Sequence, residues 1–164
     1  MESRVKLFGH AIHPMLIVFP LGLLGMAAIF DLLFLFTGNT GLSAAGYYMI
    51  PAGVVLGLAA ALFGAVDWLA VPAGTRARAV GLWHGLGNVV VVLLFALSWL
   101  MRSDLAPHAP GSLPIALSVL GLVLALVTGW LGGELVERLG IGVDPGAHPD
   151  APSSLSDERP VGAA

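Results

Sequence analysis

Four long apolar stretches constrain every fold that this sequence can adopt. They lie at about residues 13–36, 47–70, 79–101 and 113–135, and each is almost free of charged residues. A helix of roughly 20 residues crosses a hydrocarbon layer of ~30 Å, so each stretch is long enough to span a bilayer. Only 10% of the 164 residues are charged, against roughly 25% in soluble domains. The sequence therefore predicts a chain that crosses a membrane four times.

The segments between the stretches are short and rich in glycine, proline, serine and threonine, which is typical of turns. Short turns place consecutive helices antiparallel, so we predict an all-α, up-and-down bundle of four transmembrane helices over residues 1–139. Residues 140–164 contain many glycines and prolines and few large apolar residues. That composition predicts a disordered tail.

The positive charges predict an orientation. Of the basic residues near the span ends, five fall on the side of the predicted bundle that holds both termini, and Arg102 is alone on the other side. Because basic residues concentrate on the cytoplasmic side of a membrane, both termini are expected in the cytoplasm, with the helices in a bacterial inner membrane. The five residues are Arg4, Lys6, Arg76, Arg78 and Arg138.

Several kinds of function are excluded or disfavoured by composition. The sequence contains no cysteine, which excludes disulfides, iron–sulfur ligation and thiol catalysis. Its net charge of −3 provides no basic field for nucleic acid. The expected surroundings are lipid, and glycine and alanine at four-residue spacing favour close helix packing and leave a homo-oligomer open. A stand-alone enzyme is not expected.

Four polar side chains are predicted to converge at the end of the bundle that holds the termini. His13 begins the first span and His84 lies shortly after the start of the third, while Asp67 and Glu134 lie near the ends of the second and fourth. Asn88 follows His84 by one helical turn and shares its face. Polar groups inside a membrane are costly and mark candidate functional sites.

Three hypotheses fit these residues. His13 and His84 are expected at similar depth, so they could be the axial ligands of one haem b in an electron-transfer protein, with Asn88 beside them. Alternatively, His13, His84, Asp67 and Glu134 could bind a divalent metal or handle protons in a small transporter or accessory factor. The third hypothesis is a membrane subunit or scaffold without a cofactor, in which the polar residues are structural.

The sequence supports at most one haem inside the membrane. A second haem near the other face would need a second histidine pair, and that side offers only His108 in a proline-rich loop. We therefore do not expect this chain alone to carry electrons across a bilayer.

Four short motifs, in order, resemble a bacterial membrane family known as domain of unknown function 2231. They are "HPMLIVFPLGL", "GAVDW", "LWHGLGN" and "GWLGGELVERLGIGV", and the resemblance covers about residues 8–143. It implies a four-helix membrane domain without a settled activity. Members are often grouped with b-type cytochromes and some look fused to an iron–sulfur domain, which favours a redox function.

The resemblance also implies which positions matter. Because this chain has no cysteine and no fused iron–sulfur module, any electron partner would be a separate protein. The positions that match the family motifs are His13, Pro14, Pro20, Asp67, Trp68, His84, Asn88, Gly132, Gly133 and Glu134.

Overall fold

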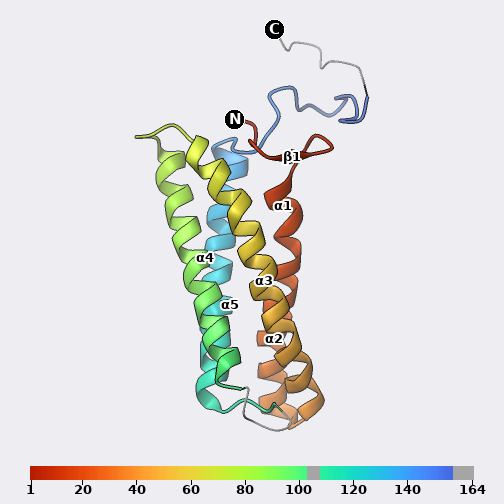
Figure 1. Cartoon of the computed structure of the whole chain (residues 1–164), viewed down its shortest axis with the longest axis vertical. Coiled ribbons are helices and arrows are strands. Elements are labelled where there is room, and N and C mark those ends of the chain that lie inside the picture. Colours follow the sequence, from red (N-terminus) through yellow and green to blue (C-terminus); the bar gives the residue numbers. More distant parts are fainter. Residues whose placement is uncertain (103–107, 157–164) are drawn as a thin grey trace.

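The protein is a bundle of four long helices, as predicted (Figure 1). The structure is a computed structural model that describes residues 1–102 and 108–156. All four helices are long and apolar enough to cross a membrane, and most of their large apolar side chains face outward, which fits contact with lipid. Residues 157–164 of the predicted tail and part of the turn before the last helix lie outside the described residues.

The first span is divided into α1 (Ile12–Leu16) and α2 (Val18–Thr37), with Ile17 between them. The sequence predicts a kink from Pro20, and the break lies one turn before that residue. Proline has no backbone N–H, so Pro20 leaves the carbonyl of Leu16 without its helical donor. The chain still continues in one direction, because the N–H of Ile17 donates to His13 and that of Leu21 donates to Ile17.

Two of the other three spans begin at side-chain caps. Helix α3 covers Thr40–Ala70, α4 covers Arg76–Leu100, and α5 covers Ser112–Gly133 and continues into a π-helical turn, η1, at Glu134–Arg138. Asn39 and Thr75 accept backbone N–H groups at the starts of α3 and α4. Helix α3 thus starts well before residue 47, where the predicted span begins, because the Asn39 cap makes the preceding glycine- and serine-rich segment helical.

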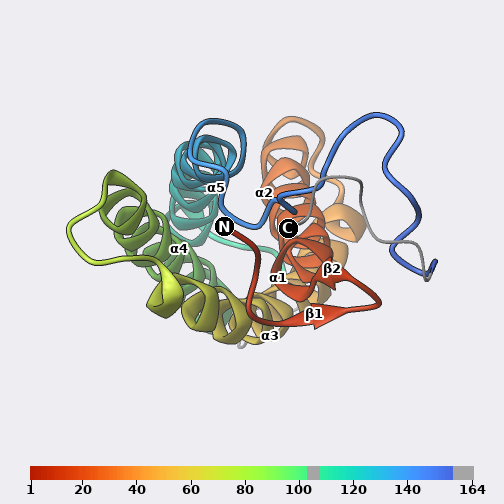
Figure 2. The ribbon, with the colours of Figure 1, turned by 90° about the horizontal axis from the view of Figure 1, so that it is seen from above.

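The bundle consists of two antiparallel helical hairpins that pack side by side. The first span packs mainly on α3, and α4 packs mainly on α5. Seen along the bundle, the first span and α4 lie diagonally opposite, with α3 and α5 between them (Figure 2). The N-terminus, the end of α5 and the α3–α4 turn lie at one end, here called the terminal end, and the α2–α3 turn lies at the other, the far end (Figure 1).

The two hairpins are equivalent position by position along their inner faces. Leu24 and Phe95 are 71 positions apart, and both are core residues. Each packs against a glycine of the next helix: a Cβ on Gly53 would lie 2.7 Å from Leu24, and a Cβ on Gly121 would lie 2.8 Å from Phe95. These two glycines are 68 positions apart. The bundle therefore has an approximate two-fold axis along its length.

The N-terminal segment forms a small hairpin that the sequence analysis does not predict. Strand β1 (Lys6–Leu7) pairs antiparallel with β2 (His10–Ala11), and Phe8 and Gly9 form the turn with positive φ. The hairpin lies against the terminal end of the bundle (Figure 2). The N–H of Ile12 then donates to the carbonyl of Val5, which ties the start of α1 to this hairpin.

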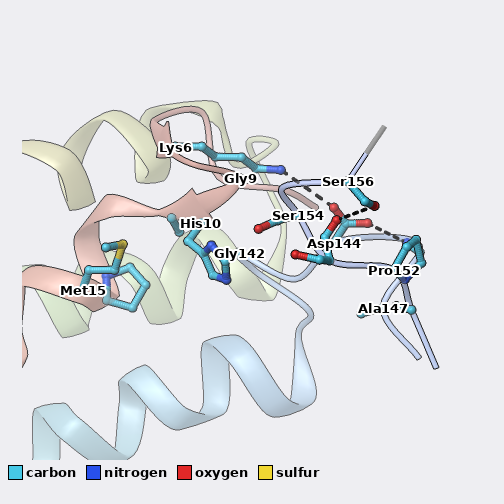
Figure 3. A pocket seen from close by; sticks show the side chains of 15 residues that line it. Lys6, Gly9, His10, Met15, Gly142, Asp144, Ala147, Pro152, Ser154 and Ser156 are labelled. Atoms are coloured by element: carbon cyan, nitrogen blue, oxygen red, sulfur yellow. Dashed lines mark hydrogen bonds and ion pairs between the residues drawn. The ribbon is translucent and has the colours of Figure 1, made fainter. Parts of the chain in front are cut away.

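Residues 140–156 follow η1 without a helix or strand and return to the N-terminal hairpin. The Met1 ammonium donates to the Gly140 carbonyl, and Ser154 donates to the carbonyl of Phe8. A shallow hollow lies between hairpin and tail, where Lys6 points toward Asp144 (Figure 3). The disorder of the tail stays a prediction.

Candidate functional site

His13 and His84 meet inside the terminal end of the bundle. Their ring centroids are 6.4 Å apart, and the ring planes are nearly perpendicular, at 85°. His13 lies on α1 and His84 on α4, so the two rings come from diagonally opposite helices. Both side chains are half-buried. The depth argument from the sequence thus placed these two residues correctly relative to each other.

Each ring is held by a backbone carbonyl of the helix beside it. Nδ1 of His13 lies 2.8 Å from the carbonyl oxygen of Ala60, and Nδ1 of His84 lies 2.8 Å from that of Thr128. A carbonyl only accepts, so each Nδ1 carries a proton and donates it. In the neutral imidazole, Nε2 then carries the lone pair. This tautomer is the one that metal-ligating histidines commonly adopt, with the second nitrogen bonded to a carbonyl or carboxylate.

Two glycines make room for the rings. A Cβ on Gly64 would lie 2.9 Å from two atoms of the His13 ring, and a Cβ on Gly132 would lie 3.1 Å from Cε1 of His84. Each glycine follows the accepting residue, Ala60 or Thr128, by one turn, so a side chain there would cover the carbonyl that the ring reaches. Sequence analysis missed Gly64 as a site residue. The 68-residue offset that it shares with Gly132 is the signal that identifies it.

Of the two histidines, Asn88 is hydrogen-bonded to His84. Its Nδ2 lies 3.2 Å from Nε2 of His84 and donates at 2.9 Å to the carbonyl of the same residue. Its Oδ1 accepts from the Thr128 hydroxyl at 3.0 Å. The predicted neighbour relation between His84 and Asn88 is therefore present, and it links α4 to α5.

The two acidic residues of the predicted metal site lie in other interactions. The Asp67 carboxylate accepts from the Ser3 hydroxyl and the backbone N–H of Arg4, each at 2.7 Å, and so holds the N-terminal segment. Glu134 pairs with Arg76 at the bundle surface. Within residues 1–102 and 108–156, no three His, Cys, Asp or Glu side chains are grouped to hold a metal ion. The structure thus brings together the two histidines but not the four predicted metal ligands.

The far end holds an ion pair that sequence analysis did not predict. Nη1 of Arg102 donates to Oδ1 of Asp31 at 2.7 Å, and both side chains are fully buried. The second carboxylate oxygen accepts from Arg102 and Ser118, and Arg102 also donates to Ser98. Each partner lies 18 positions after a histidine of the pair. That shared spacing is the signal that predicts the pairing.

Comparison with known proteins places the chain in a family. Residues 9–145 match a family described as "Predicted membrane protein (DUF2231)". A search of curated proteins and a search of solved structures found no match. The matched region includes all four spans, the histidine pair and the far-end ion pair. The chain therefore belongs to the DUF2231 family of predicted membrane proteins.

Proposed function

We propose that this protein transfers electrons at a bacterial inner membrane and binds one haem b between His13 and His84. The observation that carries the proposal is the matched pair of imidazoles at the bundle axis. Both rings donate Nδ1–H to a carbonyl, so Nε2 is the nitrogen that would bind a metal; in His84 that nitrogen also lies 3.2 Å from Nδ2 of Asn88. A single redox centre near one membrane face exchanges electrons with a separate protein on that side, and the basic residues favour the cytoplasm as that side.

The residues fit axial ligation in three respects. Two imidazoles that share one metal at about 2 Å per bond have centroids roughly 6 Å apart, and the observed distance is 6.4 Å. The rings come from equivalent positions of two hairpins, so a metal on the two-fold axis would meet equal ligands. Gly64 and Gly132 keep side chains away from the flanks of both rings.

The residues of the chain then have distinct roles. His13 and His84 would hold the iron, and the carbonyls of Ala60 and Thr128 fix each ring and its tautomer. Haem supplies a reversible one-electron change at its iron when bound. Asp67 holds the N-terminal segment that leads into His13, which positions that ligand without contacting it.

The test is an absorption spectrum of the protein purified in detergent from a haem-replete host. We expect a reduced-minus-oxidised spectrum with b-type bands, which disappears in His13→Ala and in His84→Ala. His10→Ala is the matched control, because His10 is exposed in the N-terminal hairpin and its ring is hydrogen-bonded to the carbonyl of Phe8, away from the histidine pair. It should keep the full spectrum.

A colourless, folded wild-type protein would refute haem binding. Elemental analysis of that sample would separate the alternatives. Stoichiometric metal that is lost in both histidine variants would indicate a metal site, and the absence of metal would indicate a scaffold in which the pair is structural.

A further inference from the structure

Residues of the N-terminal hairpin and of the segment 142–156 border a hollow with a volume of about 920 Å³ (Figure 3). Pro14 and Met15 of α1 also line it, so the hollow extends down to the first turn of the first span. His13 and His84 do not line it. The hollow is therefore separate from the histidine pair and lies where the chain enters the membrane.

The side of the hollow that Met15 forms continues onto a lipid-facing surface of the first span. Val18 and Phe19 follow Met15 by three and four residues, and residues at these spacings share a helix face. The exposed fractions are 46% for Met15, 59% for Val18 and 53% for Phe19. In a bilayer this face contacts acyl chains, and the headgroup layer lies at the start of the span. A phospholipid on this face would therefore have its headgroup at the hollow.

The hollow also contains a carboxylate that the chain neutralises only weakly. Oδ1 of Asp144 accepts the N–H of Gly146 at 2.8 Å, which fixes the side chain in a turn. Oδ2 of Asp144 lies 4.0 Å from Nζ of Lys6, whereas the same Nζ lies 2.5 Å from Oε2 of Glu2. The charge of Lys6 is thus paired mainly with Glu2. Because the Asp144 side chain is 53% exposed, its Oδ2 can accept a bond from a cationic ligand.

We propose that this hollow binds the headgroup of a phospholipid that carries a primary ammonium group. The ammonium of the lipid donates to Asp144, the phosphate lies beside Lys6, and the acyl chains cover Met15, Val18 and Phe19. An ammonium ion has N–H donors for a carboxylate, and a lysine side chain is a common partner of phosphate. The site does not depend on haem binding at the histidine pair.

Native mass spectrometry of the full-length protein in detergent tests this inference. The protein is titrated with three phospholipids that have identical acyl chains and an ethanolamine, a choline or a glycerol headgroup. Choline has the charge of ethanolamine but no N–H, and the glycerol lipid has no cation. We expect the ethanolamine lipid to bind wild type about fivefold more tightly than either of the others, which is the effect of one partly exposed ion pair.

Two variants locate the site at Asp144. Asp144→Asn should remove the preference for ethanolamine while leaving the segment folded, because an asparagine Oδ1 can still accept the N–H of Gly146. Asp144→Lys should reverse the preference toward the anionic glycerol lipid. Asp150→Asn is the matched control, because it removes the same charge from the same segment at a residue that does not line the hollow. It should keep the preference of wild type.

The outcomes are distinct from those of the haem test, because a colourless protein can still show the lipid preference. Equal binding of the three lipids by wild type would overturn the inference. A preference for ethanolamine that persists in Asp144→Asn, or that is lost equally in Asp150→Asn, would also overturn the assignment to this hollow.

Discussion

At each end of the bundle, a residue of the first hairpin meets the residue at the equivalent position of the second hairpin. The two resulting pairs differ in burial and in the bonds that they make. At the far end, Asp31 and Arg102 are fully buried and bonded to each other and to serines of their own cluster. At the terminal end, His13 and His84 are half-buried, and Nδ1 of each is bonded to a backbone carbonyl. The charges of Asp31 and Arg102 neutralise each other, whereas the histidine pair is the set of metal ligands proposed above.

The ion pair and the histidine pair lie at opposite ends of the bundle. Eighteen residues of helix, ~27 Å, lie between the two pairs. Between them, an apolar core that includes Leu24, Ile50 and Phe95 excludes polar groups. We therefore expect changes at the far end to alter stability first, and changes at the terminal end to alter ligand binding first.

Arg102→Ala should have the largest effect on stability. It leaves the buried carboxylate of Asp31 without its counterion, which costs about 3–5 kcal/mol in buried pairs. Thermal unfolding in detergent should show a large loss. Replacing both partners by apolar residues, Asp31→Leu with Arg102→Met, should restore most of it. A double variant as unstable as the single one would show that the pair has a role beyond neutralising two buried charges.

Gly64→Ala should affect the histidine pair directly. The added methyl group would meet the His13 ring at 2.9 Å, and such overpacking costs about 1–3 kcal/mol. We expect a lower melting temperature and, under the haem binding proposed above, a lower haem content in the purified protein. Gly85→Ala is the control, because a Cβ there meets nothing within 4 Å. An equal loss of stability in both variants would contradict the conclusion that Gly64 makes room for the His13 ring.

Asp67→Ala should release the N-terminal segment while leaving the pair assembled. It removes the acceptor of Ser3 and of the Arg4 backbone, at a cost of about 1–2 kcal/mol. Hydrogen exchange should increase over residues 1–11 and remain unchanged around Asn88. If exchange increased equally in both regions, Asp67 would belong to the histidine site itself.

Glu134→Gln should have the smallest effect. Its partner, Arg76, is 60% exposed, although the Glu134 side chain itself is only 17% exposed, and an ion pair with one solvated partner contributes about 1 kcal/mol or less. Thermal unfolding and cofactor content should both stay close to wild type. A marked loss of bound metal in this variant would instead indicate that Glu134 is a metal ligand, as the sequence predicts.

The helices of the fold could be predicted from the sequence because a lipid bilayer strictly limits which segments can cross it. A spanning segment must be long, apolar and helical, and runs such as residues 113–135 can satisfy that demand in only one way. The turns were less well predicted. Thr40 begins α3 because Asn39 caps it, and in the segment before Tyr47 the local hydrogen bond outweighs the glycine and serine content.

The sequence by itself also determined that His13 and His84 share a depth, because helix direction and residue spacing fix depth along a bundle. Only the tertiary structure decided which polar residues touch. Asp67 and Glu134 have the depth of the histidines but face Ser3 and Arg76, and Asp31 reaches Arg102 across the bundle. Depth follows from the rise along one helix, whereas contact depends on the rotation of each helix about its axis, which the packing of glycines such as Gly53 and Gly121 sets.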